Sequence, residues 1–161
     1  MSHLHVGDPA PDFELPDDAG MMHRLSAQRP RPVVVYFYPA DMTPGCTTEA
    51  CEFRDANAEI RALGAEVWGI SPQDGKSHAK FREQQALTFP LLVDADHAVA
   101  EAYGVWVEKK RYGRTYWGIA RETFLVDEDG RIARVWEHVK PEGHAAEVLE
   151  ALRGKQAAAA S

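Results

Sequence analysis

Apolar residues along this 161-residue chain follow two different spacings. Continuous runs rich in β-branched and aromatic residues predict buried strands at residues 33–38, 66–71 and 89–93. Between these runs, apolar residues three or four positions apart predict helices at residues 47–63 and 76–85. Because strands and helices alternate in this part of the chain, we expect the three strands to pair in parallel.

The remaining segments predict a different arrangement toward the two ends of the chain. They are a hairpin of residues 13–15 and 23–25, a short helix at 97–103, strands at 122–126 and 131–136 around the turn Asp127-Glu128-Asp129-Gly130, and a final helix at 143–152. The complete order predicts an α/β fold of the thioredoxin-like sandwich type. Its central mixed sheet would be flanked by helices and preceded by an N-terminal β-hairpin extension.

Composition adds the expected number of domains. With 45% hydrophobic and 27% charged residues, the chain has the balance of one globular domain with a sizeable core. We assign that domain to residues 1–154. Residues 155–161 have no apolar face to bury, so we expect a disordered tail there.

Charge and hydropathy exclude several kinds of partner. The net charge is -7 and the basic residues are scattered, which argues against nucleic acid and anionic lipid. The chain contains no run of 18 apolar residues and no basic N-terminal segment followed by an apolar one, which argues against a membrane protein or a secreted one. We therefore expect a cytosolic protein.

The two cysteines indicate chemistry more than architecture, because a secreted domain held by disulfides would carry more of them at wider spacing. Cys46 follows the turn-forming residues 39–45, between the end of a predicted strand and the start of a helix. Unpartnered backbone N–H groups at a helix start favour negative charge and stabilise a thiolate. The alternative is a buried and unreactive cysteine, the commoner fate of this residue.

Cys51 is the only thiol in the chain that could condense with an oxidised Cys46. On a regular helix, residues five apart are separated by about 7.5 Å along the axis, more than the ~7 Å between Cα atoms that a disulfide tolerates. The helix start would have to unwind before the bond closed, so the spacing favours a redox cycle over a permanent staple. A zinc site is a weaker alternative, because no histidine or second cysteine pair lies nearby in the sequence.

Three segments carry a resemblance to a known family. The stretch from Tyr38-Pro39 through Cys46-Thr47-Thr48-Glu49-Ala50-Cys51 to Asp55 resembles the active-site segment of the peroxiredoxins, in the bacterioferritin-comigratory or peroxiredoxin Q subfamily. Residues 103–127 and 6–13 are similar to other signatures of that subfamily, so the resemblance covers essentially the whole domain. Ala40 departs from the pattern, which more often has lysine there.

The resemblance implies roles for five residues. Pro39 would shield the reactive sulfur, Thr43 would offer its hydroxyl to the peroxide, and Cys46 would attack as the peroxidatic cysteine. Arg121 matches a distant active-site arginine; without the resemblance, a surface salt bridge would be the better interpretation. Cys51 would be the resolving cysteine.

The implied activity is that of a thiol-dependent peroxidase that reduces hydrogen peroxide and organic hydroperoxides without a cofactor or metal. Cys46 would become a sulfenic acid, form a disulfide with Cys51, and be recycled by thioredoxin or a similar reductant. An intramolecular resolving cysteine requires no second subunit, so we expect a monomer.

Two alternatives stay open at this stage. One is a disulfide oxidoreductase on the same fold, although the Cys-x-x-Cys pair of thioredoxins is absent. The other is a noncatalytic redox sensor whose helix melts on oxidation. The sequence leaves three further roles open. Glu49 could support the thiol segment through an ion pair or hydrogen bond, or be a helix surface charge. Trp106 and Trp117 could line an apolar approach to the thiol, although packing is the ordinary interpretation of aromatic residues.

Overall fold

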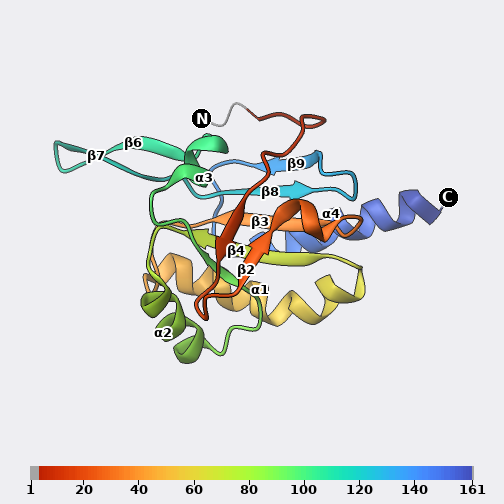
Figure 1. Cartoon of the computed structure of the whole chain (residues 1–161), viewed down its shortest axis with the longest axis horizontal. Coiled ribbons are helices and arrows are strands. Elements are labelled where there is room, and N and C mark those ends of the chain that lie inside the picture. The colour runs from red at the N-terminus through yellow and green to blue at the C-terminus, as the bar shows by residue number, and fades with distance from the viewer. Residues whose placement is uncertain (1–3, 161) are drawn as a thin grey trace.

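A central five-stranded sheet organises the chain, which a computed structural model describes over residues 4–160 (Figure 1). The strand order is β5-β4-β3-β8-β9. The bounds are β3 (Val33–Phe37), β4 (Glu66–Ser71), β5 (Leu91–Val93), β8 (Glu122–Val126) and β9 (Ile132–Trp136). β3, β4 and β5 pair in parallel, whereas β8 and β9 add in antiparallel fashion. The predicted mixed sheet is confirmed.

Helices cover both faces of this sheet. They are α1 (Pro44–Ala62), α2 (Gly75–Gln85), α3 (Ala98–Ala102) and α4 (His144–Ala160). Val34 and Tyr36 of β3 pack in one core with side chains of α1, α2 and α4, while Val35 and Phe37 pack in the opposite core with α3. β3 is therefore buried on both faces, which explains its uninterrupted apolar sequence.

The N-terminal extension is the predicted β-hairpin. It consists of β1 (Glu14–Pro16) and β2 (Met22–Arg24) in antiparallel pairing, followed by the 3-10 helix η1 (Leu25–Gln28). Phe13 and Leu25 at its two ends are buried in the core that also contains α3. The extension thus closes the sheet face opposite α1 and α4.

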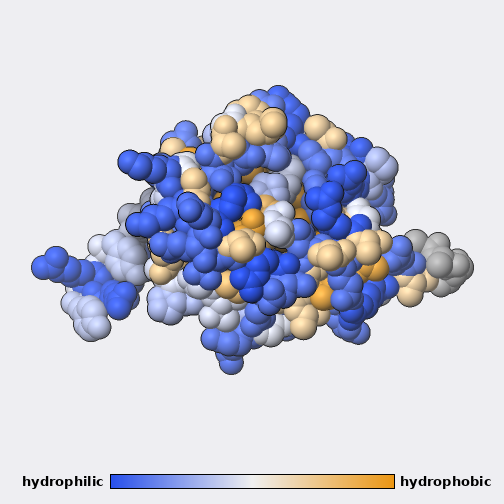
Figure 2. Space-filling model, turned by 90° about the horizontal axis from the view of Figure 1, so that it is seen from below, coloured by the Kyte–Doolittle hydropathy of each residue, from blue (hydrophilic) through white to orange (hydrophobic). Residues whose placement is uncertain are grey.

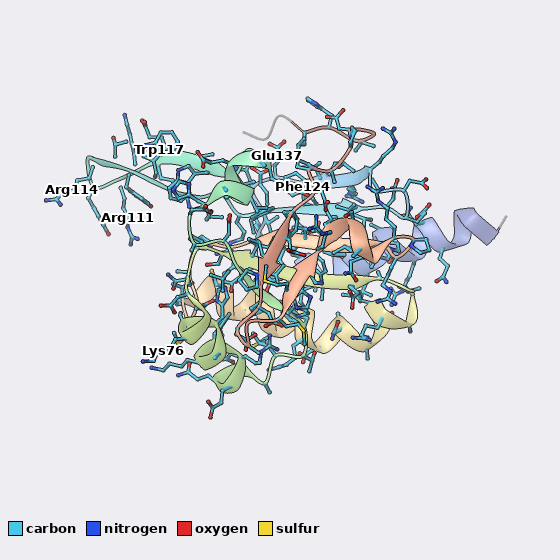
Figure 3. The ribbon with its side chains drawn as sticks, viewed as in Figure 1. Lys76, Arg111, Arg114, Trp117, Phe124 and Glu137 are labelled. Atoms are coloured by element: carbon cyan, nitrogen blue, oxygen red, sulfur yellow. The ribbon has the colours of Figure 1, made fainter. Side chains whose placement is uncertain are left out.

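An arm that the sequence analysis did not predict projects from the body of the molecule. It is a separate antiparallel hairpin of β6 (Trp106–Arg111) and β7 (Arg114–Ile119). Figure 3 shows Arg111, Arg114 and Trp117 on this arm, away from the central sheet. Tyr112 at its tip is 91% exposed.

Two helix ends differ from the prediction by more than one residue. α1 begins at Pro44, three residues earlier than expected, because proline fits the first helical position, where no N–H partner is needed. α4 continues to Ala160, eight residues beyond the predicted end of the last helix and into the stretch for which we expect a disordered tail. Ser161 lies outside the described residues. Alanine has the highest helix propensity, and Lys155 pairs with Glu128 at 3.3 Å. The assignment of one domain to residues 1–154 stays a prediction.

Seen from the side of α1 and α2, the surface is mostly hydrophilic, and hydrophobic residues gather toward the C-terminal end of α4 (Figure 2). Within residues 4–160, none of the helices combines the length and the apolar character needed to cross a bilayer.

Candidate active site

The first turn of α1 holds the candidate nucleophile. Cys46 is the third residue of this helix and is only 2% exposed. Thr43 precedes the helix but does not cap it, because its hydroxyl donates backward to the carbonyl of Ala40 at 3.0 Å. The first amides of α1 therefore receive no side-chain cap from Thr43 and contribute a positive end to the helix dipole at the Cys46 sulfur.

Arg121 reaches this sulfur from the neighbouring part of the sheet. It immediately precedes β8, whose first residue, Glu122, pairs with Phe37 at the end of β3. From there its Nη2 donates to Cys46 Sγ at 3.4 Å. A Cβ at Gly45 would lie 3.2 Å from that nitrogen, so glycine leaves room for the guanidinium group. The fold thus brings together two predicted site residues that are 75 positions apart.

Glu49 completes a triad with Cys46 and the half-buried Arg121. It lies three residues after Cys46 on α1, is 1% exposed, and accepts a hydrogen bond from Arg121 Nη1 at 2.7 Å. Its Oε2 is buried without a hydrogen-bond partner. Burial raises the pKa of Glu49 to about 7, although the charge of Arg121 opposes the shift. Of the two interpretations that the sequence left open for Glu49, a helix surface charge is wrong, since the residue is buried and paired with Arg121.

The raised pKa predicts how stability depends on pH. Between pH 4.5 and about 7, folded Glu49 holds a proton that the unfolded chain has lost. The free energy of unfolding should fall as pH rises through this window, by at most about 3 kcal/mol. Glu49→Gln, which cannot ionise, should lose less stability over the same window in urea unfolding. Glu83→Gln, an exposed α2 substitution, should follow the parent; an equal pH slope in Glu49→Gln and the parent would contradict the prediction.

The projecting arm contributes a second cation near the triad. Lys109 of β6 is partly buried and donates to the carbonyl of Ile119, two residues before Arg121. Burial, followed by the charge of Arg121, lowers the pKa of Lys109. The arm also carries Trp106 and Trp117, whose rings lie 6.4 Å apart between centroids. Trp106 stacks on His97 at 3.9 Å, so packing accounts for at least one of the two tryptophans.

Cys51 lies on the same helix as Cys46, and both thiols are free. The Cys51 thiol is partly buried and donates to Gln85 Oε1 of α2 at 3.3 Å. Arg54 strengthens this contact between α1 and α2 by donating to the carbonyl of Gln85 at 2.7 Å. Because α1 runs unbroken through both cysteines, a bond between them requires its first turns to open.

Pro39 and Thr43 lie in the loop between β3 and α1, both partly buried. Among the residues that the structure describes, no group of three or more histidine, cysteine, aspartate or glutamate side chains is arranged to hold a metal ion.

A buried thiol beside an arginine, at the start of a helix in a thioredoxin-like sandwich, defines a thiol redox protein. The chain belongs to the AhpC/TSA family, whose model matches residues 6–135. It is 47% identical over 150 residues to peroxiredoxin Bcp of Bacillus subtilis, covering 93% of this chain and 96% of that protein. Peroxiredoxin activity, the thiol-dependent reduction of hydroperoxides, follows from this membership.

Solved structures agree with this assignment. A PrxQ variant from Xylella fastidiosa superposes with a TM-score of 0.91 at 36% identity, covering 96% of this chain and 99% of that one. The bacterioferritin comigratory protein of Xanthomonas campestris, described for its alkyl peroxide reduction activity, superposes with a TM-score of 0.87 at 37% identity. The coverage there is 97% of this chain and 99% of that one. The expected subfamily and thioredoxin-like fold are confirmed.

Proposed function

We propose that Cys46 is the peroxidatic cysteine of this enzyme. Its thiolate attacks the terminal oxygen of a hydroperoxide, the O–O bond breaks, and the sulfur is oxidised to a sulfenic acid. The leaving oxygen takes the electron pair of the broken bond and, with a proton, departs as water or an alcohol. The observation that carries this proposal is the 3.4 Å contact between Arg121 Nη2 and Cys46 Sγ in a buried setting.

Arg121 acts both before and during the attack on the hydroperoxide. Its guanidinium group is permanently charged and offers several donors, so it stabilises the thiolate before attack and the developing charge on the leaving oxygen during it. The hydroxyl of Thr43 already donates to Ala40, and its lone pairs remain available to accept the proton of the hydroperoxide. We assign to Pro39 the shielding of the sulfur from water.

Cys51 is proposed as the resolving cysteine. Its sulfur displaces hydroxide from the sulfenic acid of Cys46, so that one water leaves and a disulfide forms. An external dithiol of the thioredoxin type then supplies two electrons and two protons and restores both thiols. The Cys51 thiol must leave Gln85 for this step, so the contact between α1 and α2 opens together with the start of α1.

A steady-state assay tests this function directly. The protein is incubated with hydroperoxide, thioredoxin, thioredoxin reductase and NADPH, and NADPH oxidation is followed. Continuous turnover that depends on hydroperoxide supports the enzyme. A single oxidation without turnover would instead support a redox sensor, and reduction of substrate disulfides without hydroperoxide consumption would support a disulfide oxidoreductase.

Substituting Arg121 with methionine should slow the first oxidation of Cys46 by roughly 100-fold, the usual effect of losing one preorganised donor at a developing negative charge. Alkylation of Cys46 at neutral pH should slow as well, because the thiolate loses its neighbouring cation. Stopped-flow oxidation and iodoacetamide alkylation measure the two effects. Arg153→Met, which removes an exposed α4 arginine, should match the parent in both. Parental rates in Arg121→Met would remove this arginine from the mechanism.

Substrate range and assembly are part of the same proposal. The alkyl peroxide reduction described for the Xanthomonas relative supports organic hydroperoxides as substrates beside hydrogen peroxide. We propose a monomer, since both cysteines lie on one helix of one chain, and sedimentation of the reduced and oxidised forms tests this. The cytosolic location stays a prediction from the sequence.

A further inference from the structure

A buried ion pair lies behind the loop that leads to Cys46. The side chains of Asp41 and His78 are both 0% exposed, and Asp41 Oδ2 is 2.6 Å from His78 Nδ1. Two hydroxyl groups complete the shell of the carboxylate: Tyr38 donates to Oδ1 and Ser77 donates to Oδ2, each at 2.7 Å. This cluster lies outside the triad described above, and the proposed mechanism leaves it unused.

The hydrogen bonds define the charges of the pair. His78 Nε2 is 2.9 Å from the carbonyl oxygen of Leu92, which can only accept, so Nε2 carries a hydrogen. Burial by itself would raise the pKa of Asp41, but the hydrogen bond and charge of His78, helped by Tyr38 and Ser77, lower it instead. Asp41 is then a carboxylate and His78 Nδ1 carries a second hydrogen. The hydrogen-bond geometry is that of an ion pair, with both ring nitrogens of His78 donating.

The two partners belong to different kinds of segment, a helix and a loop. His78 lies in the first turn of α2, which Asp74 caps by accepting from the Ser77 amide at 2.8 Å, and its ring is also tied to β5 through Leu92. Asp41 lies in the middle of the loop of residues 39–43. The next residue, Met42, has a φ of 65°, a left-handed conformation that costs a non-glycine residue about 1–2 kcal/mol. Something must hold the loop in that conformation.

We propose that the Asp41–His78 ion pair is a positioning pair, which anchors the loop of residues 39–43 to α2 so that Thr43 and Cys46 meet the hydroperoxide in the productive geometry. The proposal rests on the roles given above to Thr43 and Cys46. Nothing in the described structure puts either member of the pair in contact with the Cys46 sulfur, so the pair acts through the loop.

A purely stabilising role explains the pair poorly. Burying two charges costs several kcal/mol in desolvation, and their attraction often does no more than offset that cost, so apolar residues of similar size are commonly as stable. A buried pair does impose one arrangement on its surroundings, because any other arrangement would leave a charge without a partner. That property suits a strained loop that must return to one conformation after every catalytic cycle.

The main test compares two buried carboxylates. Asp41→Asn removes the charge that holds the loop, whereas Asp94→Asn removes one that accepts from the amides of Val99 and Ala100 in α3. We expect Asp41→Asn to slow stopped-flow oxidation of Cys46 by about tenfold or more, since a small misplacement of reacting groups has effects of this size. Alkylation of Cys46 should stay within about twofold of the parent, because Arg121 still faces the thiolate. Asp94→Asn should leave both rates unchanged.

The outcomes separate positioning from general destabilisation. Parental oxidation by Asp41→Asn, or equal slowing in Asp94→Asn at matched loss of melting temperature, would overturn the proposal. If Asp41→Asn does not fold, Ser77→Ala decides, because it removes one hydrogen bond to the same carboxylate and should slow oxidation about fivefold. An unchanged rate in Ser77→Ala would then reject the pair.

Nitrogen-15 NMR of labelled histidine tests the charges independently. Both ring nitrogens of His78 face an oxygen acceptor, so both should carry hydrogens in the parent; a ring with a hydrogen on one nitrogen only would reject the ion pair. The failure of this proposal is distinct from failure of the proposed function. If the parent protein does not reduce hydroperoxide, the proposed function is wrong. If the parent turns over and Asp41→Asn is oxidised at the same rate, only the positioning role of the ion pair is wrong.

Discussion

Replacing Cys46 with serine is expected to abolish hydroperoxide-dependent turnover, a loss of at least about 1,000-fold. A serine hydroxyl does not ionise appreciably near neutral pH, and its oxygen is a poor nucleophile toward a peroxide O–O bond. The neighbouring Arg121 cannot compensate, because it can stabilise an anion only where one forms. The thioredoxin-coupled assay and the intact mass after one equivalent of hydroperoxide measure the effect.

The fold should survive this substitution. Cys46 is 2% exposed, and serine is slightly smaller and can accept the hydrogen bond that Arg121 gives to the sulfur. Thermal unfolding of the variant should therefore remain cooperative. Appreciable turnover by a folded Cys46→Ser protein would move the peroxidatic role to Cys51, whose thiol is the only other one in the chain.

The central strands were predictable because a strand that is buried on both faces has an uninterrupted run of apolar residues. All five residues of β3 are buried, so no polar residue interrupts the run from Val33 to Phe37. The β8–β9 hairpin was also predictable, since the turn between its strands contains Asp129-Gly130, and Gly130 has a φ of 81°. In both cases the local signal and the tertiary environment agree.

The arm of β6 and β7 was not predicted, because its sequence contains neither a buried apolar run nor a recognisable turn motif. Seven of the twelve residues in β6 and β7 are exposed, so the alternation of apolar and polar positions is weak. In its turn, Tyr112 has a φ of 52° and Gly113 a φ of 74°. Two-residue turns with positive φ at both positions usually have asparagine or aspartate before the glycine. A tyrosine at this position gives no such signal.

The candidate site also contains residues that the local sequence predicts and contacts that only the tertiary structure reveals. Cys46 at a helix start and Cys51 five residues later can be interpreted from local spacing alone. The approach of Arg121 to Cys46 depends on the register of β8 against β3, so only the family resemblance could anticipate it. Asp41 and His78 meet across 37 positions with no motif between them, and their contact became visible only in three dimensions.

Replacing Cys51 with serine is expected to separate the two halves of the catalytic cycle. Serine can keep the hydrogen bond to Gln85 Oε1, so α1 and α2 should stay in place and the first oxidation of Cys46 should remain nearly as fast as in the parent. The sulfenic acid then has no thiol to condense with. It should persist and advance to sulfinic acid when hydroperoxide is in excess, and thioredoxin-supported turnover should fall at least about tenfold.

The same substitution tests whether α1 must open. In the parent, joining Cys46 to Cys51 pulls together two positions that a regular helix holds about 7.5 Å apart along its axis, so oxidation should expose the amides of the first turns of α1 to exchange. In Cys51→Ser, oxidation leaves the helix intact, and those amides should stay protected. Stopped-flow fluorescence, intact mass and hydrogen exchange on the reduced and oxidised forms measure the three quantities. A parent whose oxidised α1 stays protected, or a Cys51→Ser variant that cycles with thioredoxin at the parental rate, would reject the resolving role, because a disulfide between these positions cannot form on a closed helix.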